Sequence, residues 1–304
     1  MKVLVTGALG MLGTDLTREL AGRGFQVIGT DLQPASPDLS CEYVPLDLTD
    51  SESVKKALRK IRPEAVIHCA SWTAVDAAEE PENRALVEAV NVGGTVCLAE
   101  ICAELDSKLM FISTDYVFDG TGTEPLKPEQ VNYAPLNVYG RTKLAGEQAV
   151  AEHLSRHFIV RIAWAFGTNG KNFVQTMLRV GKTYDTVRVV NDQIGTPTYT
   201  PHLARLLGDM ILTDRYGIYH VTNEGGYLSW YDFCKAIYEE AGMNVTVLPV
   251  STAEYGLSKA ARPFNSRLDK SKLKEMGFRP LPHWREALKE YIENLKREEK
   301  LQEG

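Results

Sequence analysis

Two short motifs, far apart in the chain, carry residue types that could move a hydride and a proton. The first is Gly7-x-x-Gly10-x-x-Gly13, and the second places Tyr139 four residues before Lys143. Glycines at this spacing suit the pyrophosphate of a dinucleotide, and residues four apart lie on one face of a helix. Together the motifs indicate hydride transfer to or from a carbonyl, with a tyrosine handling the proton.

The glycine motif predicts a turn between a strand and a helix. Gly7 lets the chain reverse tightly, Gly10 lets the backbone approach the phosphates, and Gly13 lets the helix pack close to the sheet. The helix N-terminus then offers unpaired N–H groups and a partial positive charge to an anion. A glycine triplet alone is compatible with an ordinary strand–helix turn, but its position at the first strand of a βαβ pattern favours a dinucleotide.

An acid follows the next predicted strand. Asp31 stands where a carboxylate typically binds a ribose 2′-hydroxyl and repels a 2′-phosphate, which favours NAD(H). No arginine directly follows Asp31, although Lys2 or Arg23 could approach it. A solvated turn residue is the alternative interpretation of Asp31. Further on, the pair Asp47-Leu48 could meet the adenine.

The tyrosine–lysine pair needs a physical reason to act at neutral pH. A tyrosine at its ordinary pKa of about 10 is a poor proton shuttle. We expect Lys143, together with a positively charged nicotinamide, to lower the pKa of Tyr139. Lys143 could also hydrogen-bond the nicotinamide ribose, and Thr114, at the end of a predicted strand, could hydrogen-bond the substrate oxygen. A surface pair on a helix is the alternative, which the glycine turn weakens.

The elements that must position these motifs alternate between strand and helix. Apolar and β-branched runs predict strands at 2–6, 26–30, 65–69, 108–113 and 158–163, and helical spacing predicts helices at 11–23, 51–61, 84–104 and 139–153. Ser51 is the expected N-cap of its helix. Such alternation calls for right-handed crossovers. The predicted class is α/β, with a Rossmann-like, doubly wound parallel sheet covered by helices on both faces.

The regular alternation of strands and helices ends at about Phe166. Beyond it, prolines separate shorter predicted elements. We predict an NAD(P)-binding domain over residues 1–165 and a smaller, mixed, mainly substrate-binding domain over 166–304. A strand at 217–221, inside a segment near 215–235, is expected to return to the main sheet. An amphipathic helix is predicted at 288–304.

Composition argues against several other classes of protein. The net charge is −6 and the basic residues are scattered, which argues against a nucleic-acid partner. No apolar run approaches the roughly 20 residues of a membrane span, and no signal peptide is evident. The five cysteines form no CxxC pair, so neither a disulfide framework nor a metal is expected. We expect a cytoplasmic protein; a homodimer, and a role of Asp15 at an interface or a metal, stay open.

More specific strings accompany the two motifs. They are Ala70-Ser71-Trp72-Thr73, Ser113-Thr114-Asp115-Tyr116-Val117-Phe118-Asp119-Gly120, Arg161-Ile162-Ala163-Trp164, Asp192-Gln193-x-Gly195-x-Pro197-Thr198 and Arg262-Pro263-x-Asn265-Ser266. Through them the chain resembles, nearly end to end, the extended sugar-nucleotide branch of the short-chain dehydrogenase/reductase superfamily. Within that branch it is similar to the family of dTDP-4-dehydrorhamnose reductases.

The resemblance implies roles for individual residues. The implied catalytic set is Thr114, Tyr139 and Lys143. The implied cofactor contacts are Gly7, Gly10, Met11, Leu12, Gly13, Asp31, Asp47, Leu48, Ala70, Ser71, Thr73, Tyr139 and Lys143. The implied substrate contacts are Thr114, Asp115, Tyr116, Trp164, Asn172 and Arg262, with Trp164 against the sugar ring and Arg262 near the diphosphate. The implied reaction is reduction of the 4-keto group of dTDP-4-dehydro-L-rhamnose to dTDP-L-rhamnose with NADPH, with NADH also accepted.

Departures from the family pattern and rival functions bear on this expectation. The string at 70–73 replaces the more usual Ala-Ala-Tyr-Thr, and Ala163 replaces a serine, both near the expected nicotinamide and sugar. Another nucleotide-sugar reductase or an epimerase on the same scaffold is one rival. A dehydratase usually carries Thr-Asp-Glu where this chain has 114–116, Thr-Asp-Tyr. A non-catalytic NADP-binding subunit, like that of methionine adenosyltransferase, would not require both Tyr139 and Lys143. We interpret His220 as a buried structural histidine.

Overall fold

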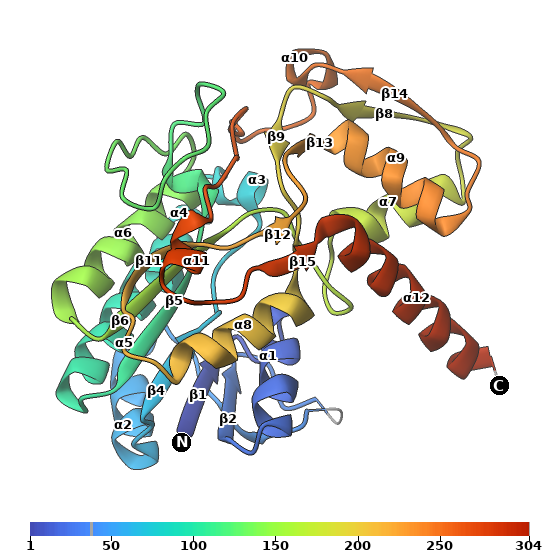
Figure 1. Ribbon diagram of the computed structural model, residues 1–304. Helices are drawn as coiled ribbons and strands as arrows, with labels where there is room; N and C mark the ends of the chain where they lie inside the picture. Colours follow the sequence, from blue (N-terminus) through green and yellow to red (C-terminus); the bar gives the residue numbers. More distant parts are fainter. Residues whose placement is uncertain (37–38, 304) are drawn as a thin grey trace.

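A seven-stranded parallel sheet forms the centre of the computed structural model, which describes residues 1–36 and 39–303 (Figure 1). Its order is β11-β6-β5-β4-β1-β2-β3. The strands are β1 (Lys2–Thr6), β2 (Gln26–Asp31), β3 (Glu42–Pro45), β4 (Ala65–His68), β5 (Lys108–Thr114), β6 (His157–Ile162) and β11 (Gly217–His220). The order reverses between β1 and β4, and ligands of such sheets bind beyond the carboxyl ends of the strands at that switch point.

The two faces of the sheet bury different residues of the same strands. Val3 and Val5 pack with α1 (Met11–Gly22) and α8 (Thr200–Ile211), whereas Leu4 faces α2 (Ser51–Ile61) and α5 (Gly94–Glu104). Alternate side chains of a strand point to opposite faces, so both faces need an apolar cover. The predicted class and the doubly wound sheet are confirmed.

One long helix crosses the second face with an irregular turn in its middle. It consists of α4 (Arg84–Glu88), a π-helical turn (Ala89–Gly93) and α5. By length and composition the segment Arg84–Glu104 could cross a membrane, with a mean hydropathy of 1.5. The expectation that no apolar run approaches a membrane span is therefore wrong. Half of the segment is buried inside the structure, where α5 packs against α2 and against α6 (Val138–His153), so we interpret it as a core helix.

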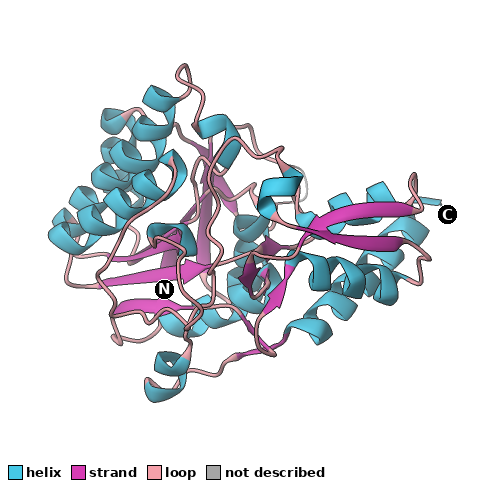
Figure 2. Cartoon of the chain, turned by 90° about the horizontal axis from the view of Figure 1, so that it is seen from above, coloured by secondary structure: helices cyan, strands magenta, loops and turns pink. Residues whose placement is uncertain are grey.

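The second half of the chain contributes to two places. Strand β11 pairs with β6 and α8 packs on α1, so the predicted return to the main sheet is confirmed. Helix α11 (Ser271–Glu275) packs on β11 of the main sheet. The other elements build a smaller part beside the sheet: β7 (Ala165–Phe166), α7 (Phe173–Gly181), β8 (Thr186–Val190), β9 (Ile194–Gly195), β10 (Thr198–Tyr199), β12 (Asn223–Glu224), β13 (Leu228–Ser229), α9 (Trp230–Ala241), β14 (Thr246–Val250), α10 (Thr252–Tyr255), β15 (Leu281–His283) and α12 (Trp284–Glu303). Figure 2 shows the two-stranded ribbon of β8 and β14 standing apart from the main sheet. The division into two domains stays a prediction.

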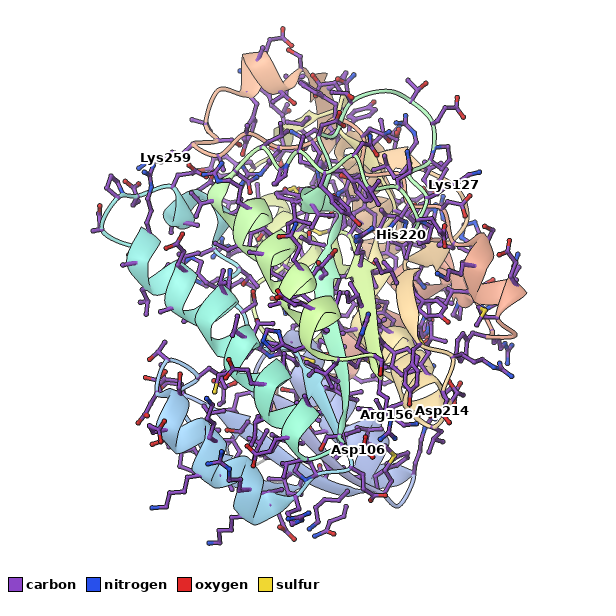
Figure 3. All side chains as sticks on the ribbon, turned by 90° about the vertical axis from the view of Figure 1, so that its left-hand side faces the viewer. Asp106, Lys127, Arg156, Asp214, His220 and Lys259 are labelled. Atoms are coloured by element: carbon purple, nitrogen blue, oxygen red, sulfur yellow. The ribbon has the colours of Figure 1, made fainter. Side chains whose placement is uncertain are left out.

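Charged residues gather at the amino end of the sheet. Asp106, Arg156 and Asp214 lie together just before β5, β6 and β11, and Arg156 Nη1 is 2.7 Å from Asp106 Oδ1 (Figure 3). Lys259 lies toward the opposite end in the same view. Ion pairs thus join the segments that precede β5, β6 and β11 at the amino end of the sheet.

Most predicted boundaries match the structure or lie within one residue of it, and two helix starts need correction. Asp50, rather than Ser51, caps α2, because its carboxylate accepts a hydrogen bond from the Ser53 N–H at 3.1 Å. The last helix starts at Trp284 instead of 288, where the short strand β15 ends. Gly304, the predicted end of that helix, lies outside the described residues.

Candidate functional site

A pocket of about 600 Å³ opens at the carboxyl ends of the sheet. It brings together predicted site residues from across the first half of the chain: Gly7, Gly10, Met11, Leu12, Asp31, Asp47, Leu48, Ala70, Ser71, Thr73, Thr114, Asp115, Tyr116, Tyr139, Lys143 and Trp164. Gly13, Asn172 and Arg262 do not line it. The size suits a ligand that is buried over most of its surface.

The glycine turn is built from backbone contacts that leave no room for side chains. Gly7 has φ +67°, and a Cβ there would lie 2.6 Å from the Ala70 nitrogen. A Cβ on Gly13 would lie 1.9 Å from the Gly7 carbonyl oxygen. Gly10 is the N-cap of α1 and provides no side-chain cap, so the first N–H groups of that helix remain available to an anion. This arrangement fits the pyrophosphate of a dinucleotide.

Asp31 is oriented by backbone donors at the rim of the same pocket. Its Oδ2 accepts a hydrogen bond from the Leu9 N–H at 3.1 Å, and its Oδ1 accepts one from the Leu32 N–H at 2.8 Å. Beside it, the hydroxyl of Thr30 is buried and has no hydrogen-bond partner within the described residues. A bound ribose would supply the hydroxyl groups that both side chains can pair with.

Neither basic residue that could have approached Asp31 does so. Lys2 Nζ donates to the Ile61 carbonyl at 2.9 Å, and Arg23 pairs with Glu19 at 2.7 Å and with Asp209 at 2.6 Å. Lys2 begins β1 and Arg23 follows the end of α1, so both cations lie at the far ends of the elements that carry the glycine turn.

The N-terminus of α6 holds Tyr139 against the end of β5. Asn137 caps the helix by accepting a hydrogen bond from the Gly140 N–H at 2.8 Å. A Cβ on Gly140 would lie 2.3 Å from the Tyr116 carbonyl oxygen, so the helix approaches this segment closely. The rings of Tyr139 and Tyr116 meet edge to face, 5.8 Å apart. The Thr114 hydroxyl is near enough to the Tyr139 phenol to act on its pKa.

The pKa of Tyr139 moves in the direction opposite to the expectation. Burial raises it above its ordinary value of 10, the charge of Asp115 raises it further, and the Thr114 hydroxyl acts against them. Lys143 is not among the groups that shift it. The expectation that Lys143 lowers this pKa is therefore wrong for the protein groups alone, because desolvation of the phenolate outweighs them. At neutral pH the phenol keeps its proton.

Lys143 lies one turn further along α6 and packs against an apolar side chain. Its ammonium is 3.9 Å from the centre of the Phe111 ring, and the side chain is buried. Burial lowers its pKa from 10.5 to about 7, although the carboxylate of Glu147 favours the charged form. Glu147 is in turn held by Arg161 at 2.6 Å and by Ser113 at 2.5 Å.

This burial predicts a pH-dependent cost of folding. Because the pKa of Lys143 is about 7 when folded and 10.5 in its ordinary state, the unfolded chain binds more protons between these values, and stability rises with pH there. We expect Lys143→Met to be more stable than the parent at pH 7. The difference between the two free energies of unfolding should decrease by up to about 1.4 kcal/mol per pH unit above pH 7, because the parent protein becomes more stable there. Urea unfolding of both proteins across this range measures it, and a constant difference would contradict the assignment.

Asp115 adds a buried carboxyl beside the phenol. Burial raises its pKa to about 6, while hydrogen bonds from Ser266 and Thr114 favour the charged form. The Thr114 hydroxyl donates to Asp115 Oδ1 at 3.1 Å and accepts from the Tyr116 N–H at 3.3 Å. The Thr114 oxygen is thus fixed at the floor of the pocket.

Trp164 lies two residues beyond the end of β6 in a strained conformation. Its φ is +50°, and a left-handed backbone costs a residue with a side chain about 1–2 kcal/mol. Its indole stacks on that of Trp230, with ring centres 3.7 Å apart and an interplanar angle of 16°. Aromatic pairs contribute about 0.5–1.5 kcal/mol beyond their buried area, so the stack offsets much of the strain.

Two predicted substrate residues are engaged outside the pocket. Asn172 caps α7 by accepting from the Gln175 N–H at 3.0 Å, and its amide group donates to the Gly167 carbonyl at 2.8 Å. Arg262 forms a two-point ion pair with Asp76, at 2.6 and 3.1 Å. Its charge still acts on Tyr116, whose pKa it lowers against the larger effect of burial. Arg262 therefore lies within electrostatic reach of Tyr116, which lines the pocket.

Two further residues noted in the sequence are structural. His220 is buried, donates from Nδ1 to the Leu126 carbonyl at 3.0 Å, and lies beneath the loop that carries Lys127 (Figure 3). This confirms the interpretation of His220 as a structural histidine. Asp15 is buried in α1 and accepts a hydrogen bond from the Thr200 hydroxyl at 2.6 Å, which joins α1 to α8.

Sequence reasoning missed several residues that line the pocket, among them Thr30, Cys69, Lys171, Thr200 and Trp230. Thr30 and Cys69 end or follow strands of the parallel sheet, and that position was a usable signal. Lys171, Thr200 and Trp230 come from the second half of the chain, where no motif marks them.

Comparison with known proteins adds an independent finding. Residues 1–297 match the family model of the RmlD substrate binding domain. The chain is 44% identical over 294 residues to dTDP-4-dehydrorhamnose reductase of Streptomyces griseus, covering 94% of this chain and 91% of that protein. It is 36% identical over 307 residues to the Escherichia coli K12 protein of the same name, covering 97% and 98%. The crystal structure of dTDP-4-dehydrorhamnose reductase from Bacillus anthracis str. Ames, in complex with NADP, superposes with a TM-score of 0.88 at 40% identity, covering 96% of this chain and 99% of that one.

Proposed function

The chain belongs to the family of the RmlD substrate binding domain, and from this membership we propose that it is an oxidoreductase that reduces the 4-keto group of dTDP-4-dehydro-L-rhamnose with NADPH, giving dTDP-L-rhamnose. The observation that carries the proposal is that one pocket contains both a turn suited to a dinucleotide and side chains suited to proton transfer. The glycine turn of α1 forms one part of its wall, and Thr114, Tyr139 and Lys143 form another.

The proposed roles of the catalytic residues follow from their surroundings. A bound reduced nicotinamide supplies hydride for the carbonyl carbon of the sugar. Tyr139 gives its proton to the carbonyl oxygen, and its raised pKa keeps that proton in place at neutral pH. The Thr114 hydroxyl, which donates to Asp115 in this structure, turns its hydrogen to the carbonyl oxygen of the substrate and so orients the carbonyl. Lys143, whose ammonium packs on the Phe111 ring, holds the ribose of the nicotinamide.

The remaining predicted residues complete the proposal. Gly7, Gly10, Met11, Leu12 and Gly13 form the phosphate turn, and Asp31, Asp47, Leu48, Ala70, Ser71 and Thr73 line the rest of the cofactor side. Asp115, Tyr116 and Trp164 face the sugar. Arg262 recognises the diphosphate, since its planar fork can make paired charge-assisted bonds. For Asn172 the cap of α7 supports only an indirect role, through the loop at 167–172. A cytoplasmic location and a homodimer stay predictions.

The decisive test is a spectrophotometric assay with dTDP-4-dehydro-L-rhamnose. We expect oxidation of NADPH, as family membership implies. We expect oxidation of NADH as well, because Asp31 can pair with ribose hydroxyls and no cation pairs with it among the described residues. Product stereochemistry at C4 is assigned by NMR. Firm dinucleotide binding without oxidation by any dTDP-4-keto sugar would favour a non-catalytic subunit. Purification with tightly bound NAD would favour an epimerase.

A further inference from the structure

Trp230 connects the smaller part of the molecule to the pocket. It is the first residue of α9, whose N-terminus is fixed by a reciprocal pair of hydrogen bonds between Ser229 and Asp232. Its ring packs on Phe173 on one side, with centres 4.5 Å apart, and stacks on Trp164. Trp230 is thus anchored by a rigid helix start and by a second aromatic ring.

The indole of Trp164 is confined from a second direction. A Cβ on Gly195 would lie 2.9 and 3.0 Å from Cε2 and Cζ2 of Trp164, so only a glycine fits there. Gly195 belongs to β9, which pairs with β13 immediately before Trp230. The same short sheet therefore places both neighbours of the Trp164 ring.

The position of this ring relative to the reacting groups follows from the sheet. Ile162, the last residue of β6, pairs in register with Thr114, the last residue of β5. Trp164 lies two residues further on and lines the same pocket as Tyr139. Both stacked indoles are half-buried: they line this pocket and also pack against the hydrophobic cluster of the smaller part. A deoxy sugar presents C–H groups on its ring faces, which an exposed indole face can cover while hydroxyl groups meet the sugar oxygens.

We propose that Trp230 is a specificity-determining residue for the sugar, because it holds the indole of Trp164 as one wall of the sugar subsite. This rests on the proposed function. Trp230 acts through Trp164, so it is a positioning residue. Without its ring, the strained backbone at Trp164 loses its main compensation, and the indole leaves the orientation that the sugar needs.

The experiment compares Trp230→Leu, Trp230→Phe and the matched control Trp284→Leu. Trp284 packs in the same hydrophobic cluster, with its ring 6.0 Å from that of Phe233, but does not line the pocket. We expect Trp230→Leu to weaken binding of dTDP-L-rhamnose, measured by calorimetry, by about 10-fold, the upper range for one aromatic pair. The KM for the keto sugar should rise equally, with KM for NADPH and kcat within about twofold. Trp230→Phe should recover most of the loss, and Trp284→Leu should bind like the parent.

Near-ultraviolet circular dichroism tests the mechanism independently of turnover. Two stacked indoles give a coupled pair of bands, which we expect to disappear in Trp230→Phe and Trp164→Phe and to persist in Trp284→Phe. Unchanged sugar binding in Trp230→Leu, or a loss shared equally by the sugar and NADPH, would overturn the proposal. Parent protein that binds the dTDP sugar without reducing it would contradict the proposed function, while weaker binding by Trp230→Leu would still support this inference.

Discussion

The Tyr139→Phe variant is expected to reduce dTDP-4-dehydrorhamnose about 10²–10⁴-fold more slowly than the parent protein, the usual contribution of a general acid. The ring and its edge-to-face contact with Tyr116 remain, and only the acidic hydroxyl is lost. Desolvation already raises the pKa of that hydroxyl, so its surroundings favour a bound proton donor over water, and we expect water to replace it poorly. Steady-state kcat, with cofactor binding measured separately by fluorescence, isolates the loss to proton transfer.

Tyr116→Phe is the matched control for this variant. Tyr116 also lines the pocket, and desolvation also raises its pKa, but we assign it to substrate binding. We therefore expect a higher KM for the sugar and a much smaller change in kcat. Undiminished turnover by Tyr139→Phe, or an equal loss of kcat in both variants, would refute the assignment of Tyr139.

The second large effect is expected for Gly13→Ala. The new Cβ would lie 1.9 Å from the Gly7 carbonyl oxygen, 2.7 Å from the Gly7 carbonyl carbon and 2.8 Å from the Ala8 Cα. All three are backbone atoms, so α1 must move away from β1 and the phosphate turn opens. We expect loss of NADPH binding in calorimetry and a destabilisation of about 1–3 kcal/mol, as for other overpacked sites.

Gly22→Ala is the control within the same helix. A Cβ there meets nothing within 4 Å, and Gly22 is not among the glycines with positive φ. Alanine at such a position stabilises a protein by about 0.4–1 kcal/mol, so cofactor binding should stay unchanged while the Tm rises slightly. Normal NADPH affinity in Gly13→Ala would mean that the close packing of α1 on β1 is not needed for the site.

The first half of the sheet and the cofactor turn could be predicted because local sequence determines them. The strand before Gly7, the helix after Gly13 and the helix that joins Tyr139 to Lys143 each have a periodic pattern that tertiary contacts did not override. The cap of α2 was misassigned because Asp50 and Ser51 are both good caps, and sequence alone does not separate them.

The rest of the site depends on contacts between distant segments. Trp230 reaches the pocket through β13 and β9, and nothing near it in the sequence marks a ligand site. Arg262 forms an ion pair with Asp76, which is far from it in the sequence, and residue type alone does not predict this pairing. The direction of the Tyr139 pKa depends on how completely the phenol is buried, and burial is a property of the assembled fold.

The place of β11 has a consequence for synthesis of the protein. β6 pairs with β5 on one side and with residues 217–220 of β11 on the other. A nascent chain on the ribosome therefore carries β6 with unpaired backbone groups until that later segment emerges, and such groups invite pairing with other chains. Truncated polypeptides that end soon after residue 165 should accumulate as aggregates in expression trials, and supplying the missing portion as a second polypeptide should restore solubility.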